Sequence, residues 1–192
     1  LVAVTGTYYV QAAAVLAADR APGRLVMGDD VPDDLKWDLW LGPAAERPYS
    51  KTYAPYGWRF WWDFGTGETG NWGCHILDIP FWALDLRYPT RVDASGPTIH
   101  DQMTPKSMAT HFQFPARGKL PPVKLHWYHT KEGPDILKES GLPHFGSGTL
   151  FVGSKGMLLC EFGKRLLFPE ERFKDFQPPP KSIPDSPGFY RE

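Results

Sequence analysis

Short strand-like runs separated by turns dominate the second half of this chain and constrain its fold most. Each run is rich in β-branched and aromatic residues, and polar or Gly/Pro-containing turns such as Ala116–Lys119 and Gly153–Gly156 separate them. Strands joined by such short turns pair in an antiparallel way, because a parallel crossover needs about a dozen residues. The pattern predicts an α+β domain with an open, mostly antiparallel sheet, formed by residues 91–99, 108–114, 123–128, 149–152 and 157–162.

One helix is predicted from Cys74 to Leu86. Asn71 has a side chain suited to an N-cap, and Pro80 predicts a kink because proline removes one backbone hydrogen bond. Spacings of three, four and three residues place four apolar side chains on one stripe that packs on the sheet or at its edge. These side chains are Ile76, Ile79, Ala83 and Leu86.

The N-terminal part is predicted to be ordered but irregular. Residues 4–10 have strand-like composition, and residues 11–20 form an alanine-rich helical pattern. From 21 to 55, turn residues predict a loop that Trp37, Trp40 and Leu41 anchor, since so much apolar surface would not stay in water. The proline-rich tail from Gln177 predicts an extended segment over the surface.

Length and composition predict one domain over residues 1–192, because 192 residues that are 42% hydrophobic can bury one core. A net charge of −1 with scattered charges argues against nucleic acid and anionic lipid as partners. No apolar run approaches the roughly 20 residues that span a membrane, so we expect a soluble protein, cytoplasmic or exported to the periplasm. The chain starts at Leu1, and we expect it to be part of a longer polypeptide.

Two cysteines, Cys74 and Cys160, imply no disulfide framework and are most simply buried thiols. The glycines at 65, 67 and 70 have the Gly-x-Gly-x-x-Gly spacing of the dinucleotide-binding fingerprint. They lack the preceding strand and the parallel βαβ context that phosphate binding needs. A backbone hinge before a helix is therefore favoured over a nucleotide site.

His75 and Asp78 lie three residues apart, and Asn71 lies four residues before His75, so the three share one helix face. An imidazole held by a neighbour can take a proton from an alcohol and return it. The same atoms could bind metal, but the other histidines are scattered and a compact zinc site is not predicted. A structural, hydrogen-bonded histidine remains an alternative on the residues alone.

Aromatic residues before the glycines could form the wall of a ligand site. Trp58, Arg59 and Trp62 belong to this block. On a later strand, either Tyr128 or the pair Trp127 and His129 could face a cleft, because alternate side chains lie on opposite faces. Core packing is the alternative for all of these residues. Lys155 lies between two strand-like runs and is interpreted as a turn residue with an exposed charge.

Four segments together resemble the C-terminal domain of the Gfo/Idh/MocA oxidoreductases, over roughly residues 30 to 165. These segments are 35–44, 56–67, 70–78 and 152–157. The resemblance implies a dihydrodipicolinate reductase-like domain with helices on one sheet face and another subunit on the other, hence a homo-oligomer. It also implies a sugar-like substrate and NAD or NADP bound mainly by an N-terminal Rossmann domain, which we expect to be absent from this chain.

The family motif places an aspartate four residues before its histidine. His75 matches the histidine, whereas Asn71 replaces the aspartate and cannot carry charge; the family's Glu-Lys-Pro segment does not occur. The resemblance thus implies that His75 is catalytic. We expect Asn71 and Asp78 to belong to the same catalytic group by orienting the reacting hydroxyl, and Trp58, Arg59, Trp62 and Tyr128 to bind substrate.

The expected function is the substrate-binding part of an NAD(P)-dependent oxidoreductase acting on a secondary alcohol of a sugar, polyol or derivative, and we expect this fragment alone to be inactive. Two alternatives stay open. One is an NAD-dependent, redox-assisted glycosidase, and the other is a non-catalytic sugar-binding or scaffold domain.

Overall fold

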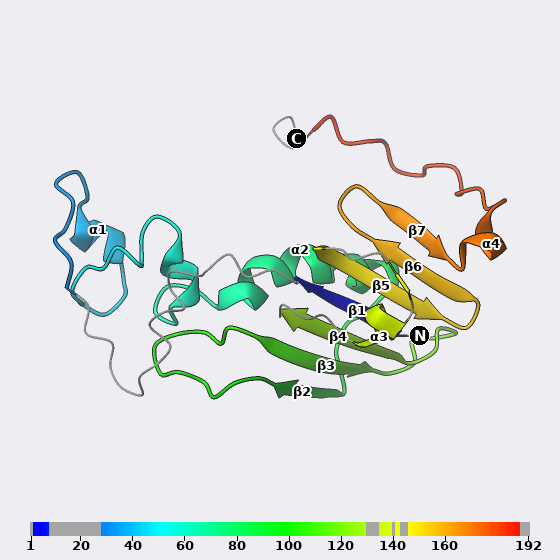
Figure 1. The fold of residues 1–192 in the computed structure, drawn as a ribbon, viewed down its shortest axis with the longest axis horizontal. Helices are drawn as coiled ribbons and strands as arrows, with labels where there is room; N and C mark the ends of the chain where they lie inside the picture. The colour runs from blue at the N-terminus through cyan, green and yellow to red at the C-terminus, as the bar shows by residue number, and fades with distance from the viewer. Residues whose placement is uncertain (1, 8–27, 130–134, 140, 143–145, 189–192) are drawn as a thin grey trace.

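A single seven-stranded sheet organises the computed structural model (Figure 1), which describes residues 2–7, 28–129, 135–139, 141–142 and 146–188. The strand order is β2-β3-β4-β1-β5-β6-β7. The strands are β1 (Val2–Thr7), β2 (Arg91–Ser95), β3 (Met108–Phe114), β4 (Val123–His129), β5 (Ser147–Gly153), β6 (Gly156–Cys160) and β7 (Arg165–Phe168).

All neighbouring strands are antiparallel except β1 and β4, which run parallel. The prediction of an open, mostly antiparallel α+β fold is therefore confirmed. β7 was not predicted, and the predicted strand 91–99 ends at Ser95. The predicted helix at 11–20 lies outside the described residues.

Helix α2 (Gly67–Ala83) packs across β1, β4 and β5 on one face of the sheet (Figure 1). Gly73, Ile76 and Pro80 form its buried side. A Cβ on Gly73 would lie 3.9 Å from the Trp127 ring, so the small residue lets the helix approach β4 closely. This contact fixes which side of the helix faces away from the sheet.

The observed helix corrects the predicted one at its start. It begins at Gly67, not at Cys74, so Asn71 lies inside the helix and is not its N-cap. Gly67 adopts a φ of +67°, a conformation that glycine tolerates, and this lets the chain turn into the helix earlier than the composition indicated. Pro80 lies within α2, which ends at Ala83 rather than Leu86.

A second correction concerns the cysteines. Cys74 is exposed on α2, where its thiol contacts the Asn71 carbonyl oxygen at 3.2 Å, so it is not a buried thiol. The side chain at 74 points away from the sheet because the buried side of the helix passes through Gly73 and Ile76. Cys160 is half-buried, and burial raises its pKa.

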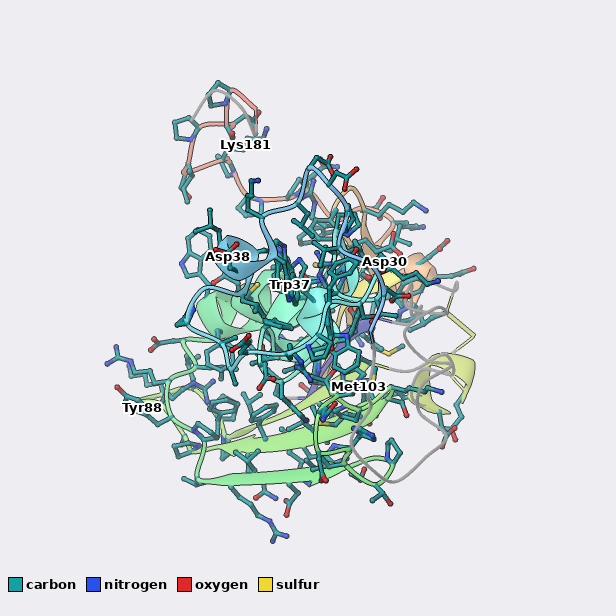
Figure 2. The ribbon with its side chains drawn as sticks, turned by 90° about the vertical axis from the view of Figure 1, so that its left-hand side faces the viewer. Asp30, Trp37, Asp38, Tyr88, Met103 and Lys181 are labelled. Atoms are coloured by element: carbon teal, nitrogen blue, oxygen red, sulfur yellow. The ribbon has the colours of Figure 1, made fainter. Side chains whose placement is uncertain are left out.

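An aromatic body precedes α2 and forms the left end of the molecule in Figure 1. It contains α1 (Trp37–Leu41) and the 3-10 turn η2 (Gly57–Phe60). Its core is Tyr53, Phe60, Trp61 and Met103, with Trp37, Trp40 and Phe64 packed against it. In Figure 2, Asp30 and Asp38 lie on either side of Trp37, which is in the crowded centre. From residue 28 on, the predicted anchoring of this segment by Trp37, Trp40 and Leu41 is confirmed, but Trp37–Leu41 forms a helix that was not predicted.

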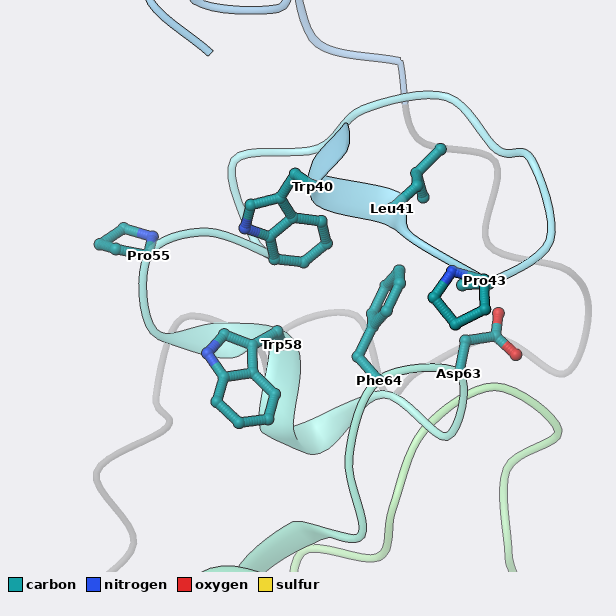
Figure 3. Close-up of a pocket in the computed structure, with 8 residues that line it drawn as sticks. Trp40, Leu41, Pro43, Pro55, Trp58, Asp63 and Phe64 are labelled. Carbon is teal, nitrogen blue, oxygen red and sulfur yellow. The ribbon is translucent and has the colours of Figure 1, made fainter. Parts of the chain in front are cut away.

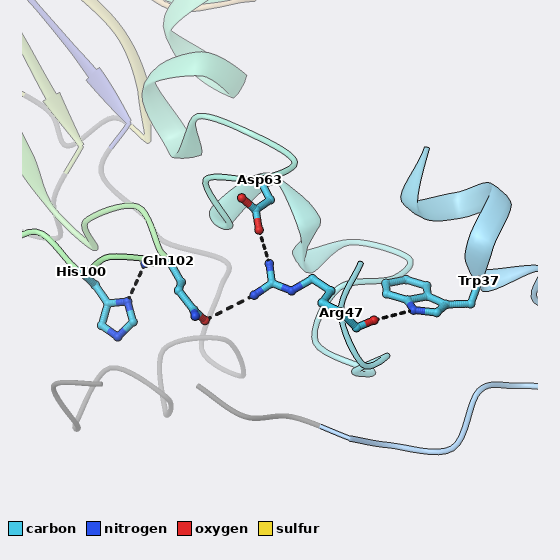
Figure 4. A network of polar contacts seen from close by, with 5 residues as sticks. All are labelled: Trp37, Arg47, Asp63, His100 and Gln102. Atoms are coloured by element: carbon cyan, nitrogen blue, oxygen red, sulfur yellow. Dashed lines mark hydrogen bonds and ion pairs between the residues drawn. The ribbon is translucent and has the colours of Figure 1, made fainter. Parts of the chain in front are cut away.

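Arg47 ties this aromatic body together (Figure 4). Its side chain is only 8% exposed, and its guanidinium lies 5.2 to 5.8 Å from the ring centres of Tyr53, Trp61 and Phe64. It donates to Asp63 at 2.6 Å and to Gln102 at 3.4 Å. One charged group therefore links three core rings to two segments far apart in sequence.

The far face of the sheet and the C-terminal tail complete the fold. Leu150 and Leu159 are buried on the face opposite α2, with Ile136 of α3 (Asp135–Glu139) and Leu142 packed against them. After α4 (Glu170–Phe173), residues 174–188 are exposed throughout. Figure 2 shows Lys181 on this extended tail, apart from the domain.

We predict that Arg47→Met lowers the free energy of unfolding by about 2–3 kcal/mol, because it removes a buried guanidinium that pairs with the half-exposed Asp63 and packs on three aromatic rings. Arg47→Lys should recover less than half of the loss, since an ammonium cannot reproduce the two-ended guanidinium contact. Urea denaturation measures both. The control is Lys51→Met, whose pair with Asp29 is 3.9 Å long and exposed, so its effect should stay below about 0.5 kcal/mol. Equal losses at both sites would contradict the role of Arg47.

His129 should make stability depend on pH. It is 2% exposed beneath α2, its Nε2 lies 3.3 Å from the Pro105 carbonyl oxygen, and its Nδ1 lies 3.4 Å from the Thr69 hydroxyl. Burial lowers its pKa, against a smaller opposing effect of the Pro105 bond. In the unfolded chain the imidazole binds a proton below about pH 6.5, whereas in the folded protein it does so only at lower pH. The contribution of His129 to the free energy of unfolding is therefore fully present above about pH 6.5 and is lost as the pH falls below it.

We therefore expect the urea midpoint to fall from pH 8 to pH 5, and His129→Gln to reduce that fall because glutamine does not titrate. Part of the fall should remain, since burial and repulsion from His111 and Lys124 also lower the pKa of His126. Identical pH profiles for wild type and variant would refute the assignment.

Candidate functional site

The outer side of α2 brings the predicted polar residues together. Asn71, His75 and Asp78 follow one another at intervals of four and three residues, opposite the buried stripe of Gly73 and Ile76. His75 and Asp78 are exposed, and Asn71 is half-buried. The imidazole of His75 is thus accessible on a helix that the sheet holds in place, where it can meet a ligand.

Aromatic side chains adjoin this stripe. The Trp72 ring lies 6.0 Å from the His75 ring and 6.1 Å from the ring of Phe162, which is itself 70% exposed. Further along α2, Ile79 and Trp82 are exposed as well. Large exposed apolar side chains around a polar group are typical of a surface that another molecule or domain covers.

Glu68 is a candidate that the sequence did not single out. It lies seven residues before His75, two turns along the same side of α2, and is only 4% exposed. Burial raises its pKa, and attraction to Arg59 opposes that shift. A glutamate in a first helical turn normally serves the helix dipole, so nothing in the local sequence distinguishes this one.

Arg59 lies close enough to Glu68 to act on it and is itself held by aromatic neighbours. Its guanidinium lies 3.8 Å from the ring centre of Tyr56 and 5.0 Å from that of Trp58. It also donates to the Tyr56 carbonyl oxygen. Since η2 contacts α2, the structure places Arg59 beside the first turn of the helix that carries His75.

The two other predicted substrate residues of this block point elsewhere. The Trp62 indole donates to the His100 carbonyl oxygen at 3.0 Å. Trp58 lines a pocket of about 430 Å³ together with Trp40, Phe64 and the Asp63 carboxylate (Figure 3). The residues around this pocket do not include His75, so Trp58 borders a separate aromatic hollow.

Tyr128 lies on the opposite face of the sheet from α2. Its neighbour Trp127 donates an indole hydrogen bond to Thr69 of α2, and successive side chains of a strand alternate between faces. The Tyr128 ring instead lies 5.9 Å from His111, whose Nδ1 is 2.5 Å from Nδ1 of His126. Within one chain, Tyr128 and His75 therefore cannot line the same pocket.

The glycine run does not form a phosphate-binding turn. A Cβ on Gly65 would lie 2.6 Å from the Arg59 backbone, and one on Gly67 would lie 2.6 Å from the Thr104 side chain. These glycines are packed against protein atoms, which supports the hinge interpretation. The glycine run therefore does not fit a dinucleotide phosphate, and we assign no cofactor contact to it.

The described part of the chain lacks both a metal-binding cluster and a membrane-spanning helix. Those residues contain no group of three or more His, Cys, Asp or Glu side chains placed to hold a metal ion. Among the same residues, no helix combines the length and hydropathy that a membrane span requires.

The comparison with known protein families adds an independent result. Residues 23–114 match the family described as oxidoreductase family, C-terminal alpha/beta domain, of the Gfo/Idh/MocA group. The match contains all of α2 and hence Asn71, His75 and Asp78. No curated protein matches the chain. Over these residues, the chain is similar to the C-terminal alpha/beta domain of the Gfo/Idh/MocA oxidoreductases.

Proposed function

We propose that this chain is the substrate-binding part of an NAD(P)-dependent oxidoreductase that acts on a secondary alcohol of a sugar or polyol. The observation that carries the proposal is the position of His75. Its imidazole is exposed on the outer side of α2, within the residues that match the oxidoreductase family. A Rossmann domain packed over this side would enclose the reacting alcohol between the two domains.

His75 takes the proton of the reacting hydroxyl in this proposal. Histidine is suited to the role because it accepts and returns protons close to neutral pH. Asn71, one turn earlier, orients the hydroxyl or the imidazole through its amide but cannot accept a proton. Asp78, one turn later, is proposed to help orient the hydroxyl or the imidazole. The nicotinamide, when bound by the Rossmann domain, supplies the hydride acceptor.

Arg59 is retained as a substrate contact in the proposal, whereas Trp58 borders its own hollow and Trp62 donates to the His100 carbonyl oxygen. Tyr128 is left out of the site around His75, because the sheet separates the two. Its face of β2, β3 and β4 is instead proposed to pack against a second copy of the chain, as the resemblance implies.

We predict that His75→Ala, in the full-length protein with its Rossmann domain, lowers turnover of the alcohol substrate by about 10² to 10⁴-fold, the usual contribution of one acid–base group. Stopped-flow or steady-state absorbance of the reduced nicotinamide measures the rate. The matched control is Cys74→Ala, an exposed neighbour on the same helix without a proposed role, which should keep near wild-type turnover.

Near wild-type turnover of His75→Ala would remove His75 from the mechanism. Product analysis separates the redox-assisted glycosidase, because that enzyme releases an aglycone from an aryl glycoside whereas a dehydrogenase accumulates ketone and reduced nicotinamide. Release of aglycone without net nicotinamide reduction would replace the dehydrogenase proposal.

A further inference from the structure

The aromatic hollow that Trp58 borders is a cavity that the proposed proton transfer leaves unused. Its volume of about 430 Å³ lies within the range of small-molecule sites, and the described residues that line it do not include His75. Three rings and one carboxylate form much of its wall, from Trp40, Trp58, Phe64 and Asp63. Figure 3 shows the two indoles on one side of the Phe64 ring and Asp63 on the other. The hollow thus has an aromatic end and an acidic end.

The rings of the hollow are held in place before any ligand binds. Trp40 stacks on Trp37 with 4.9 Å between the ring centres, and it packs edge-on against Phe64 at 5.0 Å. The Trp58 side chain borders the cavity while the residue stays 37% exposed, and its backbone N–H donates to the Tyr53 carbonyl oxygen at 2.7 Å. A ligand therefore meets a wall that loses little conformational freedom on binding, which favours affinity.

The negative charge of the hollow is already balanced within the protein. Asp63 Oδ2 accepts a hydrogen bond from the Arg47 guanidinium at 2.6 Å, and the Arg47 side chain is only 8% exposed. A cationic ligand therefore gains little from the nearby carboxylate, because the guanidinium repels it. The Asp63 side chain is nevertheless 48% exposed, and a carboxylate accepts several hydrogen bonds, so it can accept one more from a neutral hydroxyl group.

We propose that the aromatic hollow binds one pyranose ring of a neutral carbohydrate, at a site separate from His75. The C–H groups on the flat side of such a ring are slightly positive and pack on the negative faces of aromatic rings such as Trp58 and Phe64. A hydroxyl group of the same sugar donates to the Asp63 carboxylate and fixes the orientation. An open-chain polyol lacks the flat C–H side, and a purely apolar ring lacks the donor. This site does not depend on the alcohol oxidation assigned to His75.

The test is heteronuclear NMR of the indole N–H groups in the full-length protein, with each signal assigned by a single tryptophan substitution. Titration with methyl β-D-glucopyranoside should shift the signals of Trp58 and Trp40. Sorbitol and tetramethylammonium chloride should bind there about tenfold more weakly or less, because the first has no flat C–H side and the second meets a balanced charge.

Trp58→Ala should weaken binding of the glucoside, followed at the Trp40 signal, by about tenfold, as expected for the loss of one aromatic contact. Trp62→Ala is the matched control. Trp62 is 43% exposed, and its indole donates to the His100 carbonyl oxygen instead of lining the hollow, so this variant should keep the wild-type affinity.

The pyranose site is overturned if the glucoside leaves the Trp58 and Trp40 signals of wild type unmoved, or if Trp58→Ala binds it as wild type does. It is also overturned if sorbitol or tetramethylammonium binds as tightly as the glucoside. The Trp72 ring lies 6.0 Å from the His75 ring, so its signal reports on the other site separately. Failure of the oxidoreductase proposal appears as unchanged turnover in His75→Ala, while the Trp58 and Trp40 signals still decide the pyranose site.

Discussion

The close packing of α2 on β4 is the contact on which the rest of the structure depends. Gly73 lets the helix approach Trp127, whose indole donates to the Thr69 hydroxyl at 3.0 Å. The same hydroxyl lies 3.4 Å from Nδ1 of the buried His129. These contacts fix both the position and the rotation of the helix, and the rotation decides that His75 faces outward. A Cβ at position 73 would lie in ordinary contact with the Trp127 ring, at 3.9 Å, so alanine fits there, whereas a longer side chain would have to displace the ring or the helix.

The aromatic body supports a second element of the candidate site, the η2 turn. Arg47 holds the segment before α2 by pairing with Asp63 and covering the core rings, so the η2 turn that carries Arg59 has a rigid support. Glu68 is different, because its buried Oε2 atom has no hydrogen bond within the described residues.

Much of the fold could be predicted from the sequence, because it follows from local patterns. Alternation of side chains placed β3 at its observed bounds and β4 within one residue of them. The start of α2 could not be predicted, since glycines such as Gly67 and Gly73 indicate a loop until the packing that requires them is known. The parallel pairing of β1 with β4 also depends on contacts between segments more than a hundred residues apart.

The sequence by itself determined the α+β class, the family resemblance and the helix face shared by Asn71, His75 and Asp78, because each depends on residues close together in the chain. Only the tertiary structure decided that Tyr128 faces away from His75 and that Glu68 lies buried beside Arg59. Burial and the choice of sheet face arise from packing between distant segments, and no spacing within one segment encodes them.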